Sequence, residues 1–306
     1  FIGSNVINVL TKKYPENEYF NIDRLDYCAS EDNIDNASNY HYIYGNICDK
    51  HLILHILYKH NIDAIIHIAA QTHVDNSFGN SLQFTEDNVV GTHTLLECAK
   101  QYGKITKFIH MSTDEVYGEV DSEHDGCHEK SLLNPTNPYA ATKAAAEFLC
   151  RSYFISFNFP VVIVRGNNVY GPNQYPEKLI PKTIQHIMKN EKCEIHGNGE
   201  TRRNFIHCYD VAHAIDTIFQ KGELGEIYNI GSENEFSVLE ILRLLLKKLK
   251  PDCDFEESVI RIQDRPFNDF RYSINCDKLK QLGWQENVAF NEGLLDTIEH
   301  YKCKFQ

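Results

Sequence analysis

Short apolar runs alternate with helical patterns along the first part of the chain. The runs are apolar throughout rather than at every second residue, which is typical of strands that helices cover on both faces. Strands are expected at residues 19–23, 42–44, 64–68, 107–111 and 160–164. Helices are expected between them at about 4–13, 50–60, 82–102 and 137–157. This alternation predicts an α/β fold with a doubly wound parallel sheet.

The pattern is looser after Gly171-Pro172, and no internal repeat or low-complexity linker is found. Helices are expected at about 177–190, 237–250 and 291–301, a strand–helix pair at about 204–220, and a strand at 226–230. Because no linker separates the two parts, we expect one large domain with a smaller, interwoven lobe. Residues 1–172 are assigned to the large domain and residues 173–306 mainly to the lobe, with 204–232 returning to the large domain.

Composition excludes several classes of protein. The 306 residues are 42% hydrophobic, which supports a sizeable core and argues against disorder. The net charge of −13 disfavours nucleic-acid binding, which needs a basic surface, but local arginines can still bind a small phosphate-bearing ligand. No apolar run is long enough to span a membrane. We therefore expect no nucleic-acid partner and no membrane association.

Cysteines and histidines point neither to disulfides nor to a metal. The ten cysteines contain no CxxC pair, so a reducing, cytoplasmic setting is the better interpretation. His51 and His55 stand one helical turn apart, but no carboxylate or third ligand accompanies them. No metal site is expected.

The chain opens with Phe1-Ile2-Gly3 and continues directly into a helical pattern. This tripeptide has the form of the end of a glycine-rich dinucleotide-binding turn, in which Gly3 would allow close packing of helix on strand. We therefore expect a longer protein that supplies a preceding strand and the other glycines, without which the sheet has an unfilled central position. Asp23 ends a strand 20 residues after Gly3, where a carboxylate can bind the adenosine ribose hydroxyls. Because an anion there repels a 2′-phosphate, NAD is expected rather than NADP, although Arg24 beside it weakens this preference.

Two segments together point to catalysis. Residues 111–118 read Met-Ser-Thr-Asp-Glu-Val-Tyr-Gly directly after a strand, and residues 139–143 read Tyr-Ala-Ala-Thr-Lys near the start of a helix. Tyr139 and Lys143 are four residues apart and so share one helix face. A neighbouring ammonium favours the phenolate, so we expect the pKa of Tyr139 to be lowered from its reference value near 10. Tyr139 would then be a base at neutral pH.

With Ser112 and Thr113 at the strand end and Asp23 upstream, the chain resembles the extended short-chain dehydrogenase/reductase family. The resemblance implies a Rossmann-type NAD-binding domain and a nucleotide-sugar-binding lobe. It also implies that Thr113, Tyr139 and Lys143 form the redox site.

The acidic pair Asp114-Glu115 selects a branch of this family. Residues 112–118 resemble the signature of the dTDP- and UDP-glucose 4,6-dehydratases, whereas epimerases of the same fold have small or apolar residues in place of the pair. Once C4 is a ketone, one carboxylate must remove the C5 proton and one carboxylic acid must protonate the departing C6 oxygen. By the resemblance, Glu115 is the C5 base, Asp114 is the acid for the C6 oxygen, and Thr113 hydrogen-bonds the C4 oxygen. The hydride returns to C6, so no net redox occurs.

Further binding residues follow from the same resemblance. The residues expected at the cofactor are Phe1, Ile2, Gly3, Asp23, Asn46, Ile47, Ala69, Ala70, Ser112, Tyr139 and Lys143. The residues expected at the nucleotide sugar are Asn168, Glu177, Lys178, Leu179, Arg203, Asn234 and Arg265. Asn46 departs from the family, which has an Asp-Ile pair at the adenine. Arg202-Arg203 form a paired-arginine turn suited to phosphate.

The substrate base and the partners are also expectations from resemblance. Residues 265–269 read Arg-Pro-Phe-Asn-Asp where bacterial dTDP-glucose enzymes read Arg-Pro-Gly-His-Asp, and together with 165–173 they resemble the UDP-glucose dehydratase half of plant rhamnose synthases. UDP-glucose is therefore the expected substrate and dTDP-glucose the next, in rhamnose or deoxysugar biosynthesis. The alternatives are a nucleotide-sugar 4-epimerase or decarboxylase of the same fold, or a non-catalytic NAD-binding scaffold. The helices at 82–102 and 137–157 are expected to form a homodimer interface.

Overall fold

A computed structural model describes residues 1–121, 126–264 and 266–305. Its larger part holds a four-stranded parallel sheet in the order β3-β4-β5-β9 and a separate parallel pair, β1-β2. These strands are β1 (Tyr19–Asp23), β2 (Tyr40–Tyr44), β3 (Ala64–His67), β4 (Lys107–Thr113), β5 (Val161–Gly166) and β9 (Ile227–Ile230). The predicted α/β class with parallel strands is confirmed. Among the described strands no pairing joins β1 to β3, so the expected single sheet is present in two parts.

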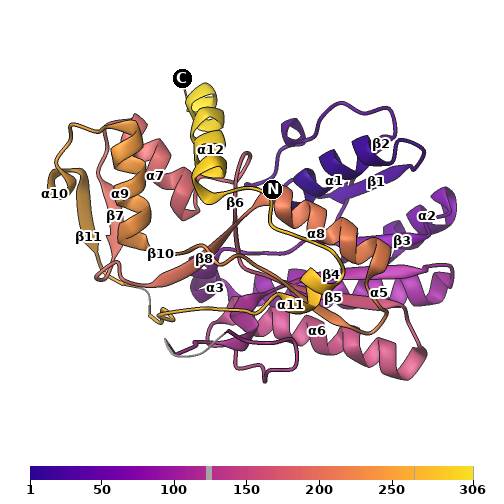
Figure 1. Ribbon diagram of the computed structural model, residues 1–306. Coiled ribbons are helices and arrows are strands. Elements are labelled where there is room, and N and C mark those ends of the chain that lie inside the picture. The colour runs from indigo at the N-terminus through magenta and orange to yellow at the C-terminus, as the bar shows by residue number, and fades with distance from the viewer. Residues whose placement is uncertain (122–125, 265, 306) are drawn as a thin grey trace.

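Helices cover both faces of the four-stranded sheet, as Figure 1 shows. Helices α1 (Ile2–Lys13) and α8 (Cys208–Lys221) cover one face, and α2 (Lys50–His60), α5 (Gly91–Tyr102) and α6 (Pro138–Phe157) cover the other. Neighbouring residues of β4 bury their side chains in opposite cores: Ile109 packs with α1 and α8, and Phe108 packs with α2, α5 and α6. This two-sided burial explains why the strand is apolar throughout.

The helix expected at 82–102 is interrupted. It consists of α4 (Ser81–Phe84), the π-helical segment η2 (Thr85–Val90) and α5, and it follows the short helix α3 (Val74–Gly79). Asp87 and Asn88, both in η2, are buried although they are consecutive and polar. π-Helical turns inside α-helices are frequent at functional sites.

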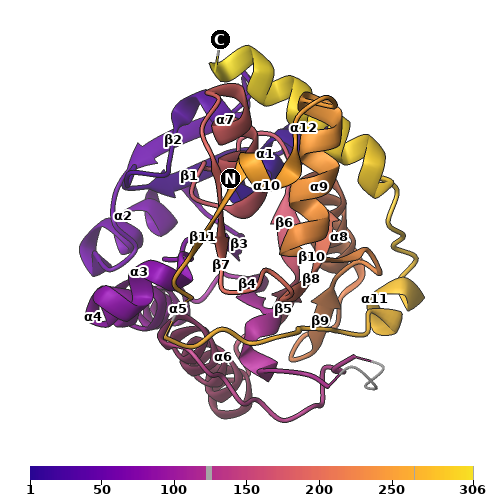
Figure 2. The ribbon, with the colours of Figure 1, turned by 90° about the vertical axis from the view of Figure 1, so that its left-hand side faces the viewer.

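The smaller lobe is built on a three-stranded sheet in the order β10-β8-β6 and on a parallel pair, β7-β11 (Figure 2). Its strands are β6 (Asn168–Tyr170), β7 (Cys193–His196), β8 (Arg202–His207), β10 (Glu235–Ser237) and β11 (Val259–Ile262). Its helices are α7 (Leu179–Met188), α9 (Val238–Leu249), α10 (Phe255–Ser258) and α12 (Phe290–Phe305). Helix α11 (Asp277–Gln281) instead lies against β9, and its Leu279 packs in the core beneath α1 and α8. A core that includes Ile184, Leu242 and Leu294 joins α7, α9 and α12.

The chain crosses between the two parts more than once. Only Asn167 separates β5 of the large sheet from β6 of the lobe. The segment 204–232 begins in β8 of the lobe, continues through α8 on the large sheet and ends at β9 within that sheet. In the described part of the chain, no helix combines the length and the apolar character needed to cross a membrane.

Candidate active site

The acidic pair lies where β4 ends in the 3-10 turn η3 (Asp114–Tyr117). Thr113 caps this turn, because its Oγ1 accepts a hydrogen bond from the Glu115 backbone N–H at 3.3 Å. The same hydroxyl donates to Asp114 Oδ1 at 3.2 Å. The turn ends at Gly118, whose φ is +78° and where a Cβ would lie 2.3 Å from the Asn134 carbonyl oxygen. A glycine is therefore required at this position, where the turn that carries the two carboxyl groups ends.

Asp114 is a carboxyl group in a nearly solvent-free position, with 3% of its surface exposed. Burial, together with the charge of Glu115, raises the pKa of Asp114 to about 7. A hydrogen bond from Asn167 Nδ2 to Asp114 Oδ2, 2.7 Å long, acts in the opposite direction because it favours the carboxylate. Asp114 can therefore carry a proton near neutral pH, as a general acid must.

Glu115 is only half-buried and is held by a different amide. Asn137 Nδ2 donates to Glu115 Oε2 at 2.9 Å, while Asn137 Oδ1 accepts the Ala140 backbone N–H at 2.8 Å and so caps α6. Neither Asn137 nor Asn167 was predicted as a site residue. An asparagine directly before Pro138 at a helix start is a cap signal that indicates the position of Asn137, but local sequence holds no signal for Asn167.

Lys143 lies on α6 with its ammonium buried beneath the end of β4. Its Nζ donates to the Met111 carbonyl oxygen at 2.6 Å, and burial lowers the pKa of Lys143 to about 8. Ser112, the next residue of β4, is also buried, and its hydroxyl has no hydrogen-bond partner among the described residues.

Tyr139 lies one helical turn before Lys143 and is buried as well. Burial, and then the charge of Glu115, raise the pKa of Tyr139, while the Thr113 hydroxyl opposes this shift. The predicted lowering of the Tyr139 pKa is therefore wrong for this structure. The reason is that the Lys143 ammonium is hydrogen-bonded to a backbone carbonyl, whereas the desolvation of the phenol and a nearby carboxylate both disfavour the phenolate.

The first predicted cofactor residues lie at the start of α1. Phe1 and Ile2 pack against the core beneath α1 and α8. A Cβ built on Gly3 would meet nothing within 4 Å. No described strand lies against Gly3, so its expected close packing on a preceding strand stays a prediction. Ala69-Ala70 follow β3 at the same edge of the sheet at which β4 ends in Thr113.

The remaining cofactor residues lie at the ends of β1 and β2. Asp23 is the last residue of β1, and its Oδ1 accepts the Leu25 backbone N–H at 2.7 Å. Asn46 Oδ1 accepts the Cys48 backbone N–H at 2.9 Å, so this departure from the Asp-Ile pair forms a local turn. The Ile47 side chain packs against Gly91 at the start of α5.

The two arginines of the paired-arginine turn make different contacts. Arg202 pairs with Glu235 at 2.7 Å, so its charge is compensated within the lobe. Arg203 stacks on the ring of Tyr272, 4.4 Å from guanidinium carbon to ring centre, and donates to the backbone oxygen of Asp269 at 2.9 Å. Within the described ranges no carboxylate pairs with Arg203. Its uncompensated charge suits a phosphate, so of the pair only Arg203 keeps the predicted function open.

Other predicted substrate residues lie beside the loop that follows β3. Lys178 Nζ donates to the Thr72 carbonyl oxygen at 2.8 Å, and Glu177 accepts a hydrogen bond from the Tyr27 hydroxyl at 2.7 Å. Leu179 begins α7, and Asn168 begins β6. Arg265, the other arginine expected at the diphosphate, lies outside the described residues.

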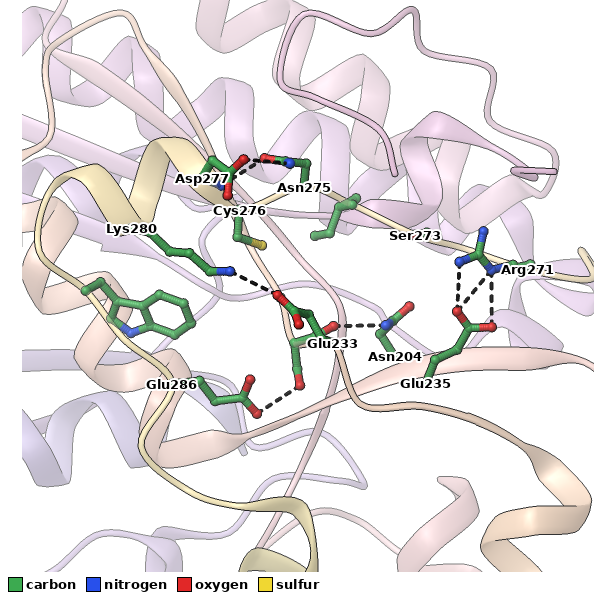
Figure 3. A pocket seen from close by; sticks show the side chains of 14 residues that line it. Asn204, Glu233, Glu235, Arg271, Ser273, Asn275, Cys276, Asp277, Lys280 and Glu286 are labelled. Carbon is green, nitrogen blue, oxygen red and sulfur yellow. Dashed lines mark hydrogen bonds and ion pairs between the residues drawn. The ribbon is translucent and has the colours of Figure 1, made fainter. Parts of the chain in front are cut away.

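A polar cavity of about 300 Å³ lies away from these groups (Figure 3). Asn234, predicted at the substrate, donates at the edge of this cavity to Glu286 Oε1 at 2.8 Å and to Ser232 Oγ at 2.6 Å. The charged groups of the wall pair with one another, as Lys280 does with Glu233. None of the five predicted catalytic residues lines the cavity. The Asn234 side chain therefore contacts residues of this cavity and not the residues that Arg203 contacts.

Comparisons with known proteins agree on one family. Residues 1–297 match the family model described as GDP-mannose 4,6 dehydratase. The dTDP-D-glucose 4,6-dehydratase of Mus musculus is 47% identical over 312 residues, which cover 100% of this chain and 87% of the mouse protein. A trifunctional UDP-glucose 4,6-dehydratase, epimerase and reductase of Arabidopsis thaliana is 47% identical over 98% of this chain. The chain spans only 45% of the length of that plant protein.

A solved structure has the same fold. The dTDP-glucose 4,6-dehydratase of Streptomyces venezuelae, crystallised with NAD, superposes with a TM-score of 0.93 at 36% identity. The superposition covers 99% of this chain and 94% of the bacterial chain.

Proposed function

The chain belongs to the nucleotide-sugar 4,6-dehydratase family whose model is described as GDP-mannose 4,6 dehydratase, and we propose that it is an NAD-dependent nucleoside-diphosphate-glucose 4,6-dehydratase. The observation that carries the proposal is the asymmetry of the acidic pair. Asp114 is buried, with its pKa raised to about 7, beside the more exposed Glu115. Two adjacent carboxyl groups in unlike environments suit a reaction that needs one acid and one base.

The elimination step assigns a role to each carboxyl group. Glu115 removes the C5 proton of the 4-keto sugar, and Asp114 donates a proton to the departing C6 oxygen. Asn137 and Asn167 hold the two carboxyl groups in place through hydrogen bonds of 2.9 Å and 2.7 Å. Elimination gives water and a 4-keto sugar with a double bond between C5 and C6. The hydride removed from C4 would then return to C6 and a proton would return to C5, which gives the 4-keto-6-deoxyglucose nucleotide with no net redox.

The redox step depends on α6 and the end of β4. Tyr139 accepts the proton of the C4 hydroxyl, and Thr113 hydrogen-bonds the C4 oxygen. Because the phenol of Tyr139 is a weak acid in this structure, it needs a cation nearby before it can act as a base. We propose Lys143, on the same helix face and protonated below about pH 8, for this role. Its ammonium would have to turn from the Met111 carbonyl oxygen toward the phenol.

The residues at the sheet edge fit NAD. The buried Ser112 hydroxyl has no partner among the described residues, and Asp23 presents a carboxylate at the end of β1. NAD supplies a hydride acceptor when it is bound. Asp23 would bind the adenosine ribose and Lys143 the nicotinamide ribose, while Phe1, Ile2, Gly3, Asn46, Ile47, Ala69 and Ala70 would line the site.

The substrate proposed is UDP-glucose, with dTDP-glucose second. Arg203 supports a diphosphate site because its charge is not paired within the described residues. Asn168, 177–179 and Arg265 complete the proposed set, whereas the contacts of Asn234 lie at the separate cavity and do not support its place there. The motif at 265–269 favours UDP-glucose. Relatives named for each substrate are both 47% identical to this chain, so turnover of the two substrates compared side by side decides between them.

Three substitutions test the proposed chemistry. Tyr139→Phe removes the base for the C4 hydroxyl, so no reduced nicotinamide absorbance should form from UDP-glucose. Glu115→Gln leaves oxidation in place but removes the C5 base, so reduced nicotinamide should accumulate while dehydration falls by roughly 10²–10⁴. Asp114→Asn should also stall at this stage, with C5 proton exchange partly retained.

The outcomes of this experiment separate the rival functions. Dehydration at a near-normal rate in Glu115→Gln would contradict the assignment, as would accumulation of reduced cofactor in Tyr139→Phe. Mass analysis for loss of water separates a dehydratase from a 4-epimerase or a decarboxylase. A scaffold would bind the dinucleotide and yield no product.

We further propose a homodimer in the cytoplasm. Helices 82–102 and 137–157 expose Leu82, Val90 and Phe148, which supports an interface there. Other apolar residues of these two helices are instead buried within the chain, namely Leu95, Leu96, Ala99, Ala144 and Tyr153. The ten cysteines are separate thiols, as a reducing compartment requires.

A further inference from the structure

Arg24 follows Asp23 at the end of β1, and the two side chains favour different cofactors. A carboxylate at this position suits the free ribose of NAD, whereas a nearby arginine is the usual partner of the 2′-phosphate of NADP. The contacts of Arg24 resolve this conflict.

The guanidinium of Arg24 is held between two carboxylates. Nε donates to Asp26 Oδ2 at 2.9 Å, and Nη2 donates to the same oxygen. Nη1 and Nη2 donate to the two oxygens of Asp87 at 2.5 and 2.6 Å. An arginine has five N–H donors, and these four bonds use four of them. Arg24 therefore has little capacity left for a phosphate.

Asp87 is a fixed anion in the buried part of η2. Only 5% of its surface is exposed, and the amide nitrogens of Gln71 and Gln83 each donate to its Oδ2 at 3.0 Å. Burial alone would raise the pKa of Asp87, but the hydrogen bonds from Arg24 and the two glutamines lower it overall. Gln71 also donates to Asp26 at 3.1 Å, which closes the network around Arg24.

The network lies at the end of the fold that is proposed to hold the adenosine. The Cys48 thiol donates to the Glu86 carbonyl oxygen in η2 at 3.6 Å, and Ile47 packs against Gly91 directly after η2. The segment η2, which carries Asp87, therefore contacts both Arg24 at the end of β1 and the 46–48 turn that follows β2. Together Asp23, Asp26 and Asp87 carry three negative charges against the single positive charge of Arg24.

We propose that Asp87, assisted by Asp26, makes this site selective for NAD over NADP by engaging the Arg24 guanidinium. A 2′-phosphate would meet an arginine already bound to two carboxylates and a surplus of negative charge. The inference rests on the dinucleotide site of the proposed function, but it concerns the choice between two dinucleotides and not the reaction.

The test measures NAD and NADP affinities of the full-length protein by calorimetry, without sugar substrate. Asp87→Asn frees one face of Arg24 and removes one negative charge, so NADP affinity should rise roughly tenfold to a hundredfold, the effect of one charged hydrogen bond. Adding Arg24→Gln to Asp87→Asn should abolish that gain. Asp35→Asn is the matched control, because Asp35 pairs with Lys12 in a separate exposed ion pair and should leave the ratio unchanged.

Each outcome decides the proposal. Asp26→Asn, on the more exposed side of Arg24, gives a second route to the same gain if Asp87→Asn does not fold. Unchanged NADP affinity in folded variants that still bind NAD overturns the inference and leaves the dehydratase proposal intact. A gain in NADP affinity that persists in the double variant with Arg24→Gln also overturns the inference. A shifted ratio in a protein that never dehydrates a sugar nucleotide supports the inference and refutes the dehydratase instead.

Discussion

The strength of the proposed acid depends on one buried hydrogen bond, so Asn167→Ala tests it directly. Asn167 Nδ2 lies 2.7 Å from Asp114 Oδ2, and both side chains are buried. A hydrogen bond to a charged group contributes about 1.5–3 kcal/mol. Since about 1.36 kcal/mol corresponds to one pKa unit, its loss should raise the pKa of Asp114 by roughly one to two units.

The assay is the pH dependence of kcat/KM for dehydration. Asp114 acts in its protonated form, so activity in the native protein should fall as the pH rises past about 7. In Asn167→Ala this descending limb should move to higher pH, because the carboxyl group keeps its proton longer. The shift should stop near pH 8, where Lys143 loses the proton that the redox step needs.

A control separates this effect from general damage to the site. Asn167 Oδ1 also accepts the Ser232 backbone N–H at 3.2 Å, so the substitution disturbs the neighbouring loop. Asn204 is another buried amide that contacts Ser232, by donating to its carbonyl oxygen at 2.9 Å. Asn204→Ala should therefore leave the limb in place. A limb that stays fixed or moves to lower pH in folded Asn167→Ala would refute the role of Asp114 as the acid.

Three further predictions concern stability and assembly. The folded-state pKa of Asp114 is raised from 3.8 to about 7, so the protein loses stability as the pH rises through this window. In thermal unfolding, Asp114→Asn should therefore be more stable than the native protein at pH 8, and this advantage should be lost near pH 4. Glu147 and Arg165 form a buried ion pair with 3% exposed on each side, so Glu147→Gln should cost about 3–5 kcal/mol in urea unfolding. Phe148, 61% exposed on α6, should lie in the dimer interface, so Phe148→Glu should yield a monomer in sedimentation, and a monomeric native protein would contradict this interface.

Local patterns predicted the strands and helices because these patterns determine burial within a few residues. The range 50–60 matches α2, and the strand at 19–23 matches β1. The positions of Thr113, Asp114 and Glu115 at a strand end and of Tyr139 and Lys143 on one helix face follow from the same local rules.

Contacts between residues far apart in the chain were beyond such rules. Asn167 reaches Asp114 across 53 positions, and Arg24 reaches Asp87 across 63. No pattern around either residue indicates its partner. The direction of the Tyr139 pKa shift was also missed, because the helical spacing indicates the nearby ammonium but not the depth of burial.

The number of residues in the π-helical segment η2 determines which of its side chains face inward. Each residue of a helix turns the chain by about 100°. Asp87 and Asn88 both face inward within η2, where Asp87 meets Arg24 and Asn88 donates to the Thr142 hydroxyl of α6 at 3.0 Å. A deletion of one residue between 85 and 90 would convert the segment to an ordinary helix and rotate one of the two side chains away. Such a deletion would keep the hydrophobic pattern. It would nevertheless break either the contact of η2 with Arg24 or its contact with α6, so that η2 would no longer link the two.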